Sequence, residues 1–141
     1  MRILGVDVGA RRVGLAISDR TRTLARPLET IEVTSGADAA ARVADAITRL
    51  ADEEDGLATV VVGMPAHLDG SASNQTMEVR AFIEQLKRRV AVPIVTEDER
   101  LSSREAESRL AVREKDWRKR KALIDAAAAA IILQDHLDRV R

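Results

Sequence analysis

The sequence predicts an α/β fold in which helices flank one mixed five-stranded sheet. Three strand-like segments come first, helix-like and strand-like segments then alternate, and the 141 residues are the length of one domain. Strands joined by short turns are expected to pair antiparallel, whereas strands separated by helices are expected to pair in parallel. We therefore expect residues 1–141 to form a single domain with three antiparallel strands followed by parallel ones.

The first half of the chain contains the three antiparallel strands and one helix. Residues 2–8 and 12–18 are apolar runs typical of buried strands, and a more polar strand is expected within residues 24–33. From Ser35 onward apolar residues recur at helical spacing, and Ser35 with Asp38 resembles a capping box. Gly56 is expected to end this helix before the β-branched run at residues 59–63.

The second half alternates between loops, helices and one more strand. A loop is expected from residue 64 to residue 75, with Ser73 or Asn74 capping a helix that precedes a strand at residues 94–96. A second capping box predicts a short helix from residue 102 to about residue 110. A basic linker should follow, and an alanine-rich helix over residues 122–137 must pack against the sheet or another helix.

Composition excludes several classes of protein. The 23 basic and 23 acidic residues give a formal net charge of +0, so the whole molecule does not attract nucleic acid globally. The absence of cysteine excludes disulfides, thiolate zinc sites and cysteine nucleophiles. No apolar run approaches the roughly 20 residues that span a bilayer, and a strand at the very start leaves no room for a signal peptide. We expect a cytoplasmic protein without a membrane partner.

Isolated acidic residues occur in three apolar settings: Asp7, the pair Asp98 and Glu99, and Asp125. A carboxylate is costly to desolvate unless something pairs with it. Convergence of these acids on a cation is the simplest explanation, and it indicates metal-dependent phosphoryl chemistry. The alternative is structural: turn amides and Arg11 or Arg12 would satisfy Asp7, and an ion pair with Arg100 or Lys121 would satisfy Asp125.

Several sequence blocks, in order along almost the entire chain, resemble the YqgF/RuvX family. They are Val6-Asp7-Val8-Gly9-x-x-Arg12-Val13-Gly14-Leu15-Ala16, Val62-Gly63-Met64-Pro65, Leu68-Asp69-Gly70-Ser71, Asp98-Glu99-Arg100-Leu101-Ser102-Ser103-x-Glu105-Ala106 and Ile124-Asp125-x-x-Ala128-Ala129. The resemblance implies an RNase H-like fold and a nuclease that processes the 5′ end of pre-16S rRNA in ribosome biogenesis. Family members are also described as Holliday junction resolvases.

The chemistry of phosphodiester hydrolysis is compatible with this resemblance and favours a metal site with three carboxylates. Two Mg²⁺ or Mn²⁺ ions about 4 Å apart can activate the attacking hydroxide and stabilise the leaving alkoxide. We expect Asp7, Glu99 and Asp125 to be the catalytic metal ligands, because hard cations prefer carboxylate oxygens. Strand alternation puts Glu97 and Glu99 on one face and Asp98 on the other. The Asp-Glu-Arg block favours Asp98 or Glu99 over Glu97, and Glu99 is preferred, with Asp98 as the alternative.

The candidate substrate contacts are Gly9, Arg12, Arg100, Lys119 and Lys121. Turn geometry alone would also explain the glycine, and basic residues near residue 120 could simply be solvated. Pre-rRNA is the favoured partner, either free or presented on ribosomal particles, and branched DNA is the alternative. A monomer would favour RNA trimming, whereas a homodimer would favour symmetric nicking of a junction. His67 and His136 are expected to be exposed to solvent.

Two other functional classes are compatible with parts of the sequence. Actin-like ATPases also begin with a strand, an Asp-x-Gly motif and a hairpin, but they close a second domain over the nucleotide, and this chain is too short for that. A non-catalytic nucleic-acid-binding module for ribosome assembly would not need the full set of acids.

Overall fold

The computed structural model describes residues 1–65, 74–98 and 117–140, with the side chains of 117–123 outside the description. The strands are β1 (Arg2–Val8), β2 (Arg12–Ser18), β3 (Ala25–Glu32), β4 (Leu57–Met64) and β5 (Ile94–Asp98). They form one sheet in the order β3-β2-β1-β4-β5, in which β1 pairs antiparallel with β2 and parallel with β4. β2 pairs antiparallel with β3, and β4 pairs parallel with β5. The predicted mixed five-stranded sheet is confirmed.

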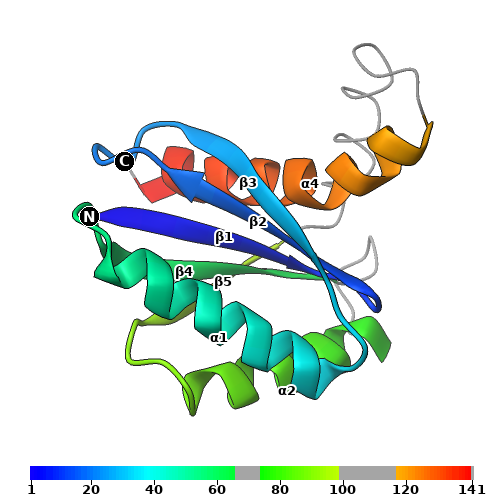
Figure 1. Ribbon diagram of the computed structural model, residues 1–141. Coiled ribbons are helices and arrows are strands. Elements are labelled where there is room, and N and C mark those ends of the chain that lie inside the picture. The colour runs from blue at the N-terminus through cyan, green and yellow to red at the C-terminus, as the bar shows by residue number, and fades with distance from the viewer. Residues whose placement is uncertain (66–73, 99–116, 141) are drawn as a thin grey trace.

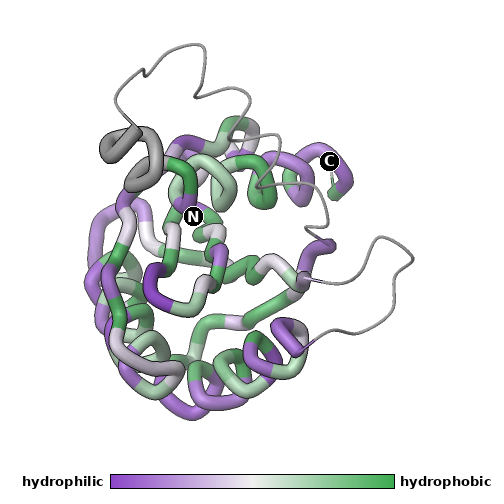
Figure 2. Tube along the Cα trace, turned by 90° about the vertical axis from the view of Figure 1, so that its right-hand side faces the viewer, coloured by the Kyte–Doolittle hydropathy of each residue, from purple (hydrophilic) through white to green (hydrophobic). Residues whose placement is uncertain are grey.

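Helices cover both faces of the sheet (Figure 1). α1 (Gly36–Asp52) and α2 (Asn74–Lys87) lie on one face, where their apolar residues form the larger core with β1, β2 and β4. α4 (Trp117–Val140) lies on the other face, over a second core. The tube in Figure 2 shows mostly hydrophobic strands in the centre and helices that alternate between hydrophobic and hydrophilic residues around them. The two cores bury the three central strands, β1, β2 and β4, on both sides.

The side chains of the central strand β1 alternate between these two cores. Leu4 and Val6 belong to the core under α1 and α2, whereas Ile3 belongs to the core under α4. Gly5 also faces α4, since a Cβ atom there would lie 2.8 Å from Cβ of Leu133. The same alternation directs Asp7 toward the α4 face.

Local signals explain where α1 begins. Ser35 is its N-cap and accepts a hydrogen bond from the backbone N–H of Asp38, at 3.1 Å. The Asp38 carboxylate accepts from the N–H of Thr34 at 2.9 Å and from Arg42 at 3.1 Å. The Thr34 hydrogen bond, followed by the one from Arg42, holds the pKa of Asp38 below its ordinary value. The predicted capping interaction is therefore confirmed, with Thr34 as the residue that makes the reciprocal bond.

The start of α4 differs from the prediction. The backbone is already helical at Trp117, five residues before the expected start, so residues 117–121 are not a linker. Arginine and lysine are good helix formers, and no glycine or proline interrupts this stretch. The expected helix at residues 102–110 lies outside the described residues. Among the helices that the structure describes, none is both long and apolar enough to cross a membrane.

Candidate active site

Asp7 lies near the carboxyl end of β1 and is 8% exposed. It carries the only acidic side chain in this strand, and its partner across the antiparallel ladder is Gly14 of β2. Because Gly14 has no side chain, this position of β2 leaves space beside the Asp7 carboxylate on the α4 face. The sheet therefore holds a mostly buried carboxylate next to a gap that another element can fill.

The backbone of α4 fills that gap at Asp125. A Cβ atom built on Gly14 would lie 1.9 Å from the carbonyl oxygen of Asp125 and 2.7 Å from the nitrogen of Ala126. α4 runs back toward the beginning of β1, so its first turns lie over the carboxyl end of that strand (Figure 1). Asp7 and Asp125, 118 positions apart in the sequence, are thus brought to the same place on one face of the sheet.

Gly14 permits the close approach of α4 to β2 at Asp125, and the motifs alone do not assign it this role. It belongs to one of the blocks that resemble the YqgF/RuvX family. The sequence does contain an indication of the close approach, because a glycine inside a buried strand often marks a site where another backbone approaches closely.

Arg12 forms an ion pair with Asp125, in which Nε of Arg12 lies 2.9 Å from Oδ2 of the carboxylate. The side chains are 31% and 20% exposed, respectively, so the pair is only partly screened by solvent. Arg12 is a partner of Asp125 that the sequence analysis does not name, whereas Arg100 and the side chain of Lys121, the expected structural partners, lie outside the description. A cation is therefore already in contact with one of the predicted metal ligands.

The turn between β1 and β2 sets the position of Arg12. The N–H of Gly9 donates to the carbonyl oxygen of Arg12 at 2.9 Å, and a Cβ atom on Gly9 would lie 2.7 Å from that oxygen. Turn geometry is thus sufficient to explain Gly9, and its contact with substrate stays a prediction.

The two acidic residues at the end of β5 lie in different environments. Glu97 is 10% exposed and forms an ion pair with Arg139, while its Oε1 lies 3.3 Å from Nδ1 of His136. This carboxylate is therefore tied to the last turns of α4, and Asp98, the next residue, is exposed. The expectation that His136 is exposed is wrong, because its side chain is 12% exposed and packs between β5 and α4.

The other predicted site residues belong to parts of the chain that the structure leaves undescribed or describes only by their backbone. Glu99, Arg100 and His67 lie outside the described residues. Lys119 and Lys121 lie in the first turns of α4, and their side chains are not described. Of the three expected metal ligands, the structure therefore brings together Asp7 and Asp125.

The two described carboxylates are suited to a hard divalent cation. Both offer oxygen donors, which Mg²⁺ and Mn²⁺ prefer, and the guanidinium at Asp125 shows that this position accommodates positive charge. Within residues 1–65, 74–98 and 124–140, no group of three or more His, Cys, Asp or Glu side chains could hold a metal ion. Glu99, the expected third ligand, lies outside these ranges.

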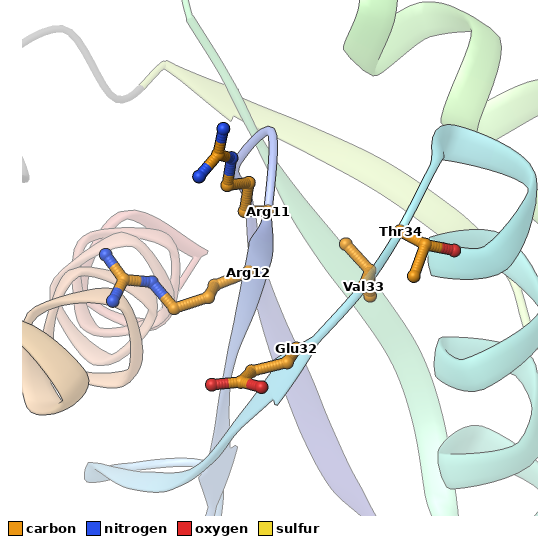
Figure 3. Close-up of a pocket in the computed structure, with 5 residues that line it drawn as sticks. All are labelled: Arg11, Arg12, Glu32, Val33 and Thr34. Atoms are coloured by element: carbon orange, nitrogen blue, oxygen red, sulfur yellow. The ribbon is translucent and has the colours of Figure 1, made fainter.

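A pocket of about 590 Å³ opens beside the ion pair (Figure 3). It lies at the ends of β2 and β3 and is lined by Arg11, Arg12, Glu32, Val33 and Thr34. The N–H of Val33 donates to the carbonyl oxygen of Arg11 at 2.9 Å, which fixes the turn before β2 against the segment that enters α1. The site thus combines two convergent carboxylates with an adjacent pocket that carries arginine side chains.

The fold is similar to that of RuvC from Thermus thermophilus, solved in complex with a Holliday junction substrate. The two share 17% identity and a TM-score of 0.57, over 99% of this chain and 95% of that one. RuvC has an RNase H-like fold, so the expected fold is confirmed.

Curated relatives match over nearly their full lengths. A protein of Anaeromyxobacter sp. (strain Fw109-5) is 44% identical over 139 residues, covering 98% of this chain and 97% of the relative. One from Desulforudis audaxviator is 36% identical over 138 residues, covering 98% and 94%. Both carry the name "Putative pre-16S rRNA nuclease". The family model described as "RuvX: Holliday junction resolvase" matches residues 1–139, and the protein belongs to this family.

Proposed function

We propose that this protein is a metal-dependent endonuclease that hydrolyses phosphodiester bonds and processes the 5′ end of pre-16S rRNA. The observation that carries the proposal is the convergence of Asp7 and Asp125 on one face of the sheet, beside a pocket with arginine side chains. The names of the relatives support a nuclease and favour ribosomal RNA as the substrate. This function would be carried out in the cytoplasm, on free precursor RNA or on ribosomal particles.

Asp7, Glu99 and Asp125 would hold two Mg²⁺ or Mn²⁺ ions. When bound, such ions lower the pKa of a water molecule and stabilise negative charge on the phosphate. The protein would hold the carboxylates in fixed positions. Asp7 lies on the central strand β1, and the backbone of Asp125 contacts Gly14. Rigid placement of this kind removes an entropic cost from the reaction.

Glu99 is the preferred third ligand, and Asp98 is the alternative. Glu97 points toward α4, where it contacts Arg139 and His136. Successive side chains of a strand point to opposite faces, so Asp98 points away from the face that carries Asp7. This alternation supports Glu99 over Asp98.

Positively charged residues would hold the substrate backbone. Arg12 lies beside Asp125, and Arg100, Lys119 and Lys121 are the further candidates. Each phosphate contact made by an arginine or lysine releases counterions, so affinity should fall as salt concentration rises.

Cleavage of four-way DNA junctions is the second candidate function. It is favoured by the description of the family and by the fold shared with RuvC. Junction resolution needs two active sites that act symmetrically, so it requires a homodimer, whereas RNA trimming can be performed by a monomer.

Cleavage assays on a labelled pre-16S rRNA 5′-end fragment and on a four-way DNA junction test the proposal. Each substrate is incubated with Mg²⁺, Mn²⁺ or EDTA and with wild type, Asp7→Asn, Asp125→Asn or Asp45→Asn. Asp45 is an exposed aspartate of α1 and provides the matched control. Circular dichroism of each variant checks that the fold is intact.

We expect metal-dependent cutting of the RNA that falls by more than about 100-fold in Asp7→Asn and Asp125→Asn, since loss of even an outer-shell partner of a metal costs about 10–100-fold. Asp45→Asn should behave as wild type. Cutting of the junction alone would establish the second candidate. Cutting that persists in EDTA or in Asp7→Asn would refute the proposed site.

A further inference from the structure

The pocket beside Asp125 contains charges of both signs. Arg11 and Arg12 bring two guanidinium groups, and Glu32 brings a carboxylate to the same lining. Arg12 and Glu32 are direct partners across the β2–β3 ladder, and both side chains extend toward the side on which α4 lies (Figure 3). Arg11 and Glu32 are both exposed, so a ligand can reach them from solvent.

The shape of this pocket is fixed by backbone contacts. The Gly9 N–H to Arg12 carbonyl bond closes the turn, and the Val33 N–H to Arg11 carbonyl bond, 2.9 Å long, holds the turn against the end of β3. Val33 is mostly buried, at 8% exposure, and forms an apolar part of the lining. The pocket's volume of about 590 Å³ is within the usual range for small-ligand pockets.

The mixed charges restrict the chemistry of the ligand. Guanidinium groups donate hydrogen bonds to phosphate oxygens, often in pairs. An ionised carboxylate only accepts hydrogen bonds and repels a phosphate, so a ligand that it favours must offer a hydrogen-bond donor. A site for a DNA backbone alone would have no use for Glu32, because deoxyribose has no 2′-hydroxyl to donate. A ribonucleotide offers both groups, a phosphate and a 2′-hydroxyl.

We propose that this pocket binds one ribonucleotide of the substrate strand next to the cleaved bond, with Arg11 on its phosphate and Glu32 accepting a hydrogen bond from its 2′-hydroxyl. Glu32 is then a specificity residue that selects RNA over DNA. This inference rests on the proposed nuclease function, and it adds the site at which the sugar of the substrate is recognised. The Arg12–Asp125 ion pair connects the pocket with the two carboxylates of the active site.

Binding can be measured without cleavage in the Asp7→Asn background. Fluorescence anisotropy with Mg²⁺ gives the Kd for a single-stranded pre-16S 5′-end RNA and for DNA of the same sequence. The variants are Arg11→Ala and Glu32→Ala. Their matched controls are Arg26→Ala, on β3 at the far end of the β2–β3 ladder, and Glu54→Ala, in the turn after α1; both residues are exposed.

Arg11→Ala is expected to weaken the binding of RNA and DNA alike, by about 5–10-fold, and to reduce the salt slope of log K by about 1. Glu32→Ala is expected to lower the preference for RNA by about tenfold, since a hydrogen bond to a charged group is lost only with RNA. A single 2′-deoxy substitution near the cleavage position should reproduce that loss, and it should have no further effect in Glu32→Ala. The control variants should bind as the parent does.

Three outcomes would overturn the inference: an RNA preference that Glu32→Ala leaves unchanged, equal effects of Arg11→Ala and Arg26→Ala, or DNA bound at least as tightly as RNA by the parent. Failure of this inference is separable from failure of the nuclease proposal. RNA cleavage that depends on Asp7 but not on Glu32 would leave the nuclease in place. If the expected binding pattern is found but no cleavage depends on Asp7, the proposed RNA selectivity of the pocket stands and the nuclease proposal fails.

Discussion

Replacement of Gly14 by alanine should displace the part of α4 that carries Asp125. The added Cβ would lie 1.9 Å from the Asp125 carbonyl oxygen, whereas ordinary contacts begin at 3.4 Å. The helix backbone would therefore have to retreat by about 1.5 Å, since neither β2 in the middle of the sheet nor a backbone carbonyl can rotate out of the way. Overpacking of this kind costs about 1–3 kcal/mol of the free energy of unfolding.

The effect on catalysis should be larger than the effect on stability. A misplacement of about 1 Å in an active site can lower the rate by about 100-fold. We therefore expect Gly14→Ala to lose at least this factor in RNA cleavage, while circular dichroism still reports a folded protein. Urea unfolding measures the stability, and the cleavage assay with Mg²⁺ measures the activity of the same preparation.

Two further glycine-to-alanine variants make the test quantitative. At Gly5 the added Cβ would meet Cβ of Leu133 at 2.8 Å and the carbonyl of Ala129 at 3.0 Å, so a smaller shift suffices and an intermediate effect is expected. At Gly36 nothing lies within 4 Å, and alanine should be neutral or slightly stabilising. If Gly14→Ala were as stable and as active as Gly36→Ala, the close approach of α4 to β2 would be refuted.

Two other predictions concern single charged residues. Arg12→Ala should lower the free energy of unfolding by about 1 kcal/mol in EDTA, because the pair with Asp125 is partly buried, and Mn²⁺ should raise its Tm by more than that of wild type, since no guanidinium then competes for Asp125. An equal Mn²⁺-induced shift in both proteins would contradict this competition. The N–H of Leu24, the Thr21 hydroxyl and the N–H of Thr23 hold the pKa of Asp19 far below its ordinary value of 3.8. A lowered pKa stabilises the fold above pH 3.8, and this stabilisation is lost as the pH falls toward the folded-state pKa. Melting curves should therefore show a Tm difference between wild type and Asp19→Ala that is constant from about pH 5 to 7 and shrinks below about pH 4. A Tm difference that grew on acidification would contradict the lowered pKa of Asp19.

The order and type of most elements follow from the amino-acid sequence alone. Apolar runs that alternate or repeat at helical spacing fix which segments can be buried as strands or helices, and this information is local. Ser35 and Asp38 specify the start of α1 because a capping interaction involves only neighbouring residues. Asp7 and Asp125 could be singled out because a carboxylate inside an apolar element differs so clearly from its neighbours along the chain.

Which of these residues meet depends on the tertiary packing. Arg12, which pairs with Asp125, lies 113 positions away from it in the sequence, and Glu97 contacts Arg139 and His136 on a helix that is separate in the chain. Such contacts depend on the direction in which α4 crosses the sheet and on how closely it approaches, and Gly14 sets that approach. Local propensities contain no information about a distance between two elements, because that distance results from the packing of both cores at once.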